Sequence, residues 1–358
     1  MAINNDRLLP NTGAALPDYQ AVGPERQDQA AWKKSMGIDP ESQIRLAKLA
    51  HMRYQHPDLD AITTFLQHFG MEIAKRTEND IWYRGYGPDQ YVYYARQGPK
   101  RFLGAAYVVE SRQDLERGAA LPSAGKIEPM EDAPGGGFIL TVTDPEGFPM
   151  CLIHGQQPRE HGPYPPRLLY NYEVEKPRAR HFTRFTPGPA AVHKLGHYGL
   201  CVRDFTSQLN FYTKHFNIVP SDFLYLDNNN NNDDGPKTTV AVFAHLDRGT
   251  DLVDHHTFFM STNPTSHVHH CSFEVHDYDT QQLGHQWLAQ QNYTPVWGVG
   301  RHILGSQIFD YWWDVSGNMI EHYADGDLVN NQTPIGYGLA GDESLAVWGP
   351  DVPKSFLD

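Results

Sequence analysis

The chain has 358 residues, of which 40% are hydrophobic and 12% aromatic, a composition that supports a packed core and about two domains. Its formal net charge of −14 argues against nucleic-acid binding, which needs a basic surface, and no apolar run approaches the length of a membrane span. The three cysteines, Cys151, Cys201 and Cys271, are too far apart for a disulfide framework, and the N-terminus does not resemble a secretory signal. These features predict a reducing, cytoplasmic location.

Residues 1–45 are predicted to be an irregular leader, because prolines and scattered charges recur along them. From residue 46 onwards a unit begins that combines a strand, an amphipathic helix and further strands. In this first unit, KLAHMRYQHPDLDAITTFLQHFGME, the apolar residues keep helical spacing, and Gly70 ends the helix. These apolar residues are Leu59, Ile62, Phe65, Leu66 and Phe69.

Three further units follow the same pattern. They open at FLGAAYVVESRQDLERGAA, at KLGHYGLCVRDFTSQLNFYTKHFNI and at HVHHCSFEVHDYDTQQLGHQWLAQQNY, and the helical stripe of the third is Phe205, Leu209, Tyr212 and Phe216. The ends also match, since DPEGFPMCLIHG (Asp144 to Gly155) parallels DVSGNMIEHYADG (Asp314 to Gly326) as a glycine turn followed by a strand. The alternative is the ordinary strand–helix alternation of a mixed chain, but agreement at both ends favours four βαβββ modules.

The modules predict an α+β protein with two two-module domains, at residues 46–160 and 193–326. A linker rich in proline and arginine, residues 161–192, separates them, and residues 327–358 form a C-terminal tail. The asparagine-rich stretch from Asp227 to Lys237 is predicted to be a surface loop without a chemical role.

Two histidines and one carboxylate stand at matching positions of the last two modules. When GHYGLCV and HHCSFEV are aligned on histidine, His197 and His270 become equivalent strand residues. Glu321 lies on the closing strand of the fourth module, and His322 points to the opposite face. A single strand histidine is more often an ordinary core residue. The combination of all three residues instead favours a facial triad, the ligand set typical of non-haem iron(II) oxygenases.

This pattern resembles the type I extradiol ring-cleavage dioxygenases of the vicinal oxygen chelate (glyoxalase/bleomycin-resistance) superfamily. The matching residues are LGHYGLCVRD around His197, DHHTFFM around His256, HHCSFEV around His270, GRH at His302, and the spacing from His302 through Tyr311 to Glu321. The resemblance covers about residues 45–325 at the level of modules, and its motifs are specific between about residues 193 and 325.

The resemblance implies two domains, each a half-open barrel of paired βαβββ modules, with metal only in the C-terminal one. His197, His270 and Glu321 match the iron(II) ligands, and manganese(II) is the alternative metal. His256 matches the acid–base histidine, although a one-residue difference in the loop would transfer this role to His255. His302 and Tyr311 match the pair that binds the substrate oxygens. In the N-terminal half the corresponding positions hold His51, Gly104 or Ala105, and Cys151, which predicts no metal there.

The implied activity is that of a non-haem iron(II) extradiol dioxygenase. Such an enzyme inserts both atoms of O₂ into a catechol-type or polyhydroxylated aromatic ring and opens it. The alternatives are a metal-dependent glyoxalase-like isomerase, epimerase or thiol transferase, and a non-catalytic ligand-binding protein. The presence of His256, His302 and Tyr311 beside a complete triad favours the dioxygenase. The expected partners are an aromatic diol and O₂, and the resemblance also suggests a homo-oligomer.

Overall fold

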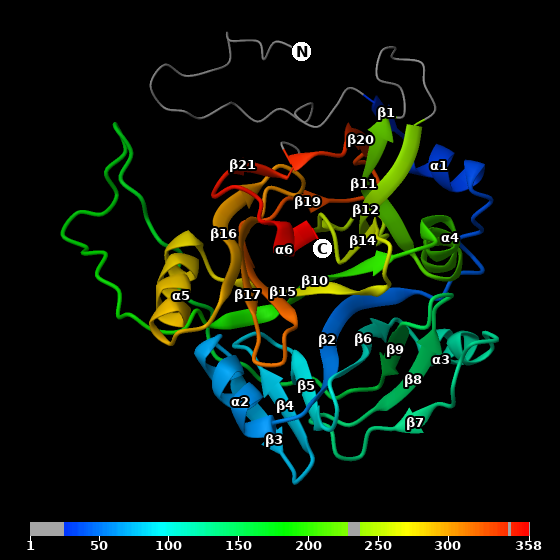
Figure 1. The fold of residues 1–358 in the computed structure, drawn as a ribbon, viewed down its shortest axis with the longest axis horizontal. Helices are drawn as coiled ribbons and strands as arrows, with labels where there is room; N and C mark the ends of the chain where they lie inside the picture. Colours follow the sequence, from blue (N-terminus) through cyan, green and yellow to red (C-terminus); the bar gives the residue numbers. More distant parts are fainter. Residues whose placement is uncertain (1–24, 228–236, 343–344, 358) are drawn as a thin grey trace.

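Two curled β-sheets form the body of the protein in a computed structural model that describes residues 25–227, 237–342 and 345–357. Figure 1 shows the N-terminal sheet, blue to teal, below the C-terminal sheet, green to red. The sheets have eight and eleven strands, and the short strands β13 (Val253–Asp254) and β19 (Leu328–Val329) pair separately. No helix in these described ranges has the length and apolar character needed to cross a membrane. The predicted asparagine-rich loop lies mostly outside the described residues.

The N-terminal sheet is built from two modules that meet at its centre. The first comprises β2 (Leu46–His56), α2 (Leu59–His68), β3 (Glu72–Arg76), β4 (Asp80–Arg84) and β5 (Tyr93–Gln97). The second comprises β6 (Arg101–Val109), α3 (Arg112–Ala119), β7 (Glu128–Pro129), β8 (Phe138–Thr143) and β9 (Pro149–His154). The strand order β3-β4-β5-β2-β6-β9-β8-β7 places the two opening strands side by side, antiparallel to each other.

The C-terminal sheet repeats this plan. The third module comprises β10 (Val192–Val202), α4 (Phe205–His215), β11 (Ile218–Asp227), β12 (Lys237–Leu246) and β14 (Phe258–Thr262). The fourth comprises β15 (His267–Val275), α5 (Tyr278–Gln290), β16 (Pro295–His302), β17 (Ile308–Trp313) and β18 (Met319–Ala324). Their order is β11-β12-β14-β10-β15-β18-β17-β16, with β10 and β15 antiparallel at the centre. The predicted α+β fold of four modules in two half-open barrels is therefore confirmed.

The same local signals start each module's helix and close two of the modules. An Asp or Ser side chain caps each helix by accepting from a backbone N–H of the first turn; the caps are Asp58, Ser111, Asp204 and Asp277. Before β9 and β18, the turns beginning at Asp144 and Asp314 contain Gly147 and Gly317 at φ of 91° and 74°. This backbone conformation favours glycine, which explains why the two module ends match in sequence.

The described part of the leader is not irregular, contrary to the prediction. It contains β1 (Glu25–Gln27) and α1 (Gln29–Ser35). β1 pairs with β20 (Ile335–Leu339) of the tail, and Trp32 on α1 is 96% buried. Asp28 caps α1, so a helix signal was present, but its apolar side chains are too few for a clear periodicity. The tail also contains β21 (Ala346–Trp348) and α6 (Lys354–Leu357).

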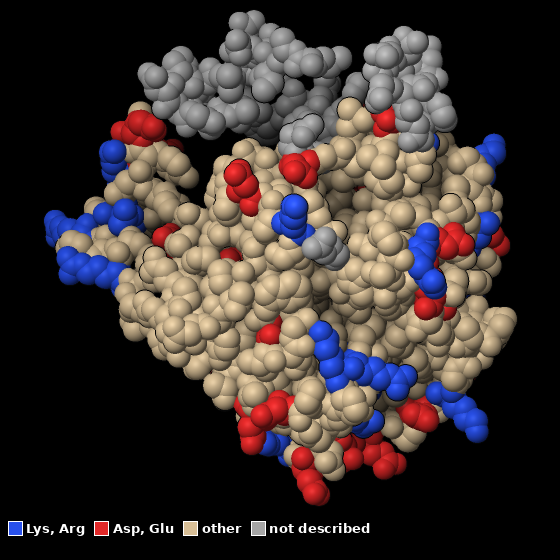
Figure 2. Space-filling model, viewed as in Figure 1, with Lys and Arg blue, Asp and Glu red and all other residues tan. Residues whose placement is uncertain are grey.

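Between β9 and β10 the chain forms neither helix nor strand over residues 155–191, all of which the structure describes. In Figure 1 this segment projects on the left as a green loop, and Figure 2 shows Lys and Arg gathered on it. The proline-rich composition that predicted a linker accounts for this extended path.

Two buried histidines join the halves of the molecule. His322 Nε2 donates to the Phe69 carbonyl at 2.7 Å and its ring stacks on Phe69. His56 Nδ1 lies 2.8 Å from Ser316 Oγ, and its Nε2 lies 2.9 Å from Tyr93 Oη. Burial lowers the pKa of His322 to about 3, and burial followed by the Lys100 charge lowers the pKa of His56 to about 4. Both imidazoles are therefore neutral in the folded protein at pH 7.

We expect these histidines to make stability fall in mild acid. Below the ordinary histidine pKa of about 6.5, each of the two imidazoles takes up a proton in the unfolded chain but not in the folded chain. Each histidine therefore lowers the free energy of unfolding by up to about 1.4 kcal/mol for every pH unit of acidification. This loss runs from pH 6.5 down towards pH 4 and is absent above pH 6.5. Urea unfolding of the metal-free protein at pH 7, 6 and 5 measures it. His56→Gln should reduce the slope of the free energy of unfolding against pH, whereas His161→Gln, in the exposed linker, should leave this slope unchanged. Equal slopes in the wild type and both variants would contradict the prediction.

Candidate metal centre

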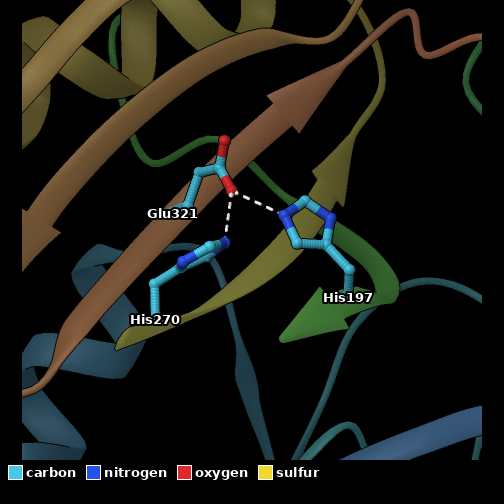
Figure 3. Close-up of side chains that lie close together, drawn as sticks. All are labelled: His197, His270 and Glu321. Atoms are coloured by element: carbon cyan, nitrogen blue, oxygen red, sulfur yellow. Dashed lines mark ion pairs between the residues drawn. The ribbon is translucent and has the colours of Figure 1, made fainter. Parts of the chain in front are cut away.

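Three neighbouring strands bring His197, His270 and Glu321 together. Ser272 of β15 is the register partner of both His197 on β10 and Glu321 on β18. His270 precedes Ser272 by two residues and so lies on the same face of the sheet. His197 Nε2 and His270 Nε2 lie 3.1 and 3.8 Å from Glu321 Oε2, as Figure 3 shows.

These three side chains fit a metal ion. All are buried, and Glu321 is fully enclosed, yet His270 Nε2 and both carboxylate oxygens have no hydrogen-bond partner in the described structure. Such orphaned buried groups are costly unless a cation satisfies them. One ligand atom from each of the three residues lies within 4.8 Å of the other two, a spacing that a single ion can bridge. Two imidazoles and one carboxylate suit iron(II) or manganese(II).

A cavity of about 260 Å³ opens onto this cluster and also reaches His256, His302 and Tyr311. The His256 ring lies 4.2 Å from the His197 ring. His302 Nε2 lies 3.0 Å from Tyr311 Oη, and Tyr311 is the register partner of Glu321 on the neighbouring strand. The structure thus brings all six residues singled out in the sequence around one site.

Burial favours the neutral forms of the three groups beside the triad. It lowers the pKa of His256 well below the usual range, and the surrounding imidazoles, His197 first, lower it further. It also lowers the pKa of His302, although Glu321 partly opposes the shift. The pKa of Tyr311 is raised well above its usual value by burial and by the Glu321 carboxylate. Two neutral imidazoles and a neutral phenol therefore face the cavity at pH 7.

His255, which directly precedes His256 in the sequence, points away from the cavity. Its Nε2 lies 2.7 Å from Asp222 Oδ2, and its Nδ1 lies 3.1 Å from His256 Nδ1. His256 lines the cavity and His255 does not. Of the two histidines that the sequence left open, His256 is thus the one whose ring meets the cavity.

A second pair of adjacent histidines is arranged in the same way. His269 Nε2 lies 2.8 Å from the Phe356 carbonyl, and His269 Nδ1 lies 2.6 Å from His270 Nδ1. A carbonyl can only accept, so a neutral His269 carries its proton on Nε2 and accepts at Nδ1. His270 then donates from Nδ1, which leaves its Nε2 lone pair facing Glu321. The sequence alone predicts no role for His269, Phe356 or Asp222; the one signal it carries is the repeated His-His dipeptide.

The N-terminal half-barrel has the same register but different side chains. At the centre of the N-terminal sheet, the pair Arg53–Gly104 corresponds to Gly199–His270 of the C-terminal sheet. On the neighbouring strand, the pair Ala106–Cys151 corresponds to Ser272–Glu321. His51, Gly104 and Cys151 therefore occupy the positions of His197, His270 and Glu321, with Gly104 rather than Ala105 in the second place. Burial lowers the pKa of His51 and raises that of Cys151, which favours the neutral form of both.

The fold and the site have the arrangement that the sequence resemblance to the vicinal oxygen chelate superfamily implies. Residues 194–322 match the family model described as the Glyoxalase/Bleomycin resistance protein/Dioxygenase superfamily. The chain is similar to metapyrocatechase 2 of Cupriavidus necator, with 36% identity over 120 residues, or 33% of this chain and 36% of the relative. The match thus spans about a third of the relative's length.

Solved structures match over nearly the whole chain. Homoprotocatechuate 2,3-dioxygenase from Arthrobacter globiformis has a TM-score of 0.70 at 19% identity, covering 88% of this chain and 92% of that one. The Mn(II)-bound glyoxalase from Novosphingobium aromaticivorans has a TM-score of 0.68 at 19% identity, covering 87% and 94%. At this identity the likeness concerns the fold alone.

Proposed function

We propose that the chain is a non-haem iron(II) extradiol dioxygenase that opens a catechol-type ring with both atoms of O₂. One observation carries the proposal: the cavity that opens onto the buried metal cluster is also lined by His256 and by the His302–Tyr311 pair. The cluster consists of His197, His270 and Glu321. Similarity to a metapyrocatechase over about a third of the chain supports it. The homo-oligomeric state and the cytoplasmic location stay predictions.

In the proposed mechanism, His197, His270 and Glu321 hold the metal ion. The bound ion would supply a Lewis acid for the diol oxygens and a redox partner for O₂. The three ligands, two neutral and one anionic, leave a divalent ion with a net positive charge. An anionic diol is therefore attracted to the site even though the cavity itself is largely apolar.

The remaining polar groups handle protons. His302 Nε2 and Tyr311 Oη are 3.0 Å apart, so together they can bind a diol oxygen and accept or return its proton. His256 lies on the His197 side of the cavity, and its neutral ring can exchange a proton with the oxygen substrate. Phe243 and Phe259 flank these groups, and their apolar rings exclude water from that side of the site.

One finding supports the glyoxalase-like alternative, namely the structural match to a Mn(II)-bound glyoxalase. An isomerase or epimerase would use the same metal ligands but consume no oxygen. Measuring oxygen uptake by iron-loaded and by manganese-loaded protein separates these activities and identifies the competent metal. Uptake that depends on an added catechol supports the dioxygenase, and metal-loaded protein that consumes no oxygen supports the alternative.

We expect His269→Ala to weaken metal binding by about 10- to 100-fold, the range typical of losing an outer hydrogen-bond partner of a ligand. The substitution removes the acceptor for His270 Nδ1 but leaves all three donors in place. Titration of the metal-free protein with Mn(II), followed by calorimetry, measures the change. His267→Ala on the same strand is the matched control and should bind as the wild type does. Equal affinities in His269→Ala and the control would show that His270 is oriented without His269.

A further inference from the structure

Beyond the metal cluster, most of the cavity wall is apolar, and its neutral polar side chains other than the histidines and Tyr311 are Ser261, Thr262 and Asn263. Its side chains come from both modules of the C-terminal half and from α6, and they include Leu224, Ala241, Phe243, Phe259, Leu304 and Phe356. Four of these six are at least 90% buried. A substituent on a ring held at the metal cluster would therefore contact hydrocarbon and aromatic surface over most of its length.

Apart from its histidines, the described lining of the cavity contains a single ionisable group with a formal charge at pH 7, Asp342, and no Lys or Arg. Arg301 is close in sequence to His302, but its guanidinium donates to the Ser306 carbonyl at 2.6 Å and to Asp325 at 2.9 Å. Lys354 on α6 is exposed and does not line the cavity. The undescribed residues next to the lining in sequence, Glu343, Ser344 and Asp358, are not basic either.

We infer that the substrate is a small catechol whose ring substituent is neutral and apolar; this rests on the proposed dioxygenase function. A carboxylate on the substituent would lose its hydration against the apolar wall without gaining a cation, which is unfavourable. Asp342 would add repulsion. The cavity volume of about 260 Å³ lies below the roughly 300–1,000 Å³ of most ligand pockets, so the best substrate has one ring and a short substituent.

A matched pair of diols tests this inference. 3,4-Dihydroxyphenylacetate and its methyl ester share the ring and differ chiefly in charge. We expect the ester to have a kcat/KM at least about 30-fold higher with the iron-loaded protein, since an unpaired buried charge has a large cost. It should also bind more tightly to Mn(II)-loaded protein under nitrogen. Values within threefold of each other in both assays would overturn the inference.

The two assays separate this inference from the proposed function. If neither diol is consumed but the ester binds more tightly, the substrate preference stands and the dioxygenase assignment fails. If both are cleaved equally well, the dioxygenase stands and the preference for a neutral substituent is wrong.

A designed cation provides an independent test. Leu357 lines the cavity and is 49% exposed, so Leu357→Arg places a positive charge beside the cavity without disturbing the core. It should narrow the ester-to-acid ratio by at least about fivefold, because a new opposite charge compensates the carboxylate. Leu328→Arg is the matched control, since Leu328 is 57% exposed and lies outside the cavity lining. An unchanged ratio in Leu357→Arg would overturn the charge-based explanation.

Discussion

Replacing His270 by alanine should leave the purified protein without stoichiometric metal and without ring-cleaving activity. The substitution removes one of three donors and leaves only His197 and Glu321 in the cluster. Affinity for the metal ion should fall by more than the about 10- to 100-fold that is typical of removing an outer hydrogen-bond partner, because a coordinating atom itself is lost. Metal analysis after reconstitution with iron(II) measures the content directly.

Cys271→Ala is the matched control for this experiment. Cys271 is buried next to His270, and its replacement removes a core side chain without removing a donor of the cluster. We expect the control to retain about one ion per chain and the wild-type shift in melting temperature on adding metal, which follows from binding to the folded state only. One tightly bound ion per chain in His270→Ala would contradict the ligand assignment.

His256→Gln should produce an enzyme that holds its metal but turns over slowly. His256 lines the cavity beside His197 but is not one of the three clustered donors. If it transfers a proton in the rate-limiting step, kcat should fall by about 10²- to 10⁴-fold, with metal content and KM for the diol little changed. Steady-state oxygen uptake, with metal content determined on the same preparation, provides all three quantities.

The adjacent histidine is the comparison for this prediction. His255 is held by Asp222 and does not reach the cavity, so His255→Gln can act only through the orientation of His256. We expect its kcat to fall by about tenfold, the lower end of the range typical of losing an outer partner. A larger loss in His255→Gln than in His256→Gln would reverse the assignment of the acid–base residue.

The repeat accounts for what the sequence could predict. Period-2 strands and a period-3.6 helix recur in each module, so matching positions in the third and fourth modules identify His197 and His270 from the sequence alone. The closing turn before β18 has the same chemistry as the turn before β9, which places Glu321 on a definite face. Residues within a module keep fixed spacing, and His302, Tyr311 and Glu321 are therefore predictable as a group.

Contacts made by segments outside the repeat were not predictable. Phe356 reaches His269 across 87 residues, and β1 pairs with β20 although about 310 residues separate them. Neither contact follows from a local period, since short segments at chain ends carry too few apolar positions to define a face. The sequence also could not decide between His255 and His256, because only the path of the loop before β14 determines which of the two rings faces the cavity.

Oxygen uptake by the iron(II)-reconstituted protein, with ¹⁸O₂ and with metal content measured on the same sample, tests the central claim most directly. On addition of a small neutral catechol, the proposed function predicts uptake of oxygen equimolar with the diol and both labelled atoms in a yellow, ring-opened product. Metal-loaded protein that consumes no oxygen with any member of a catechol panel would contradict it.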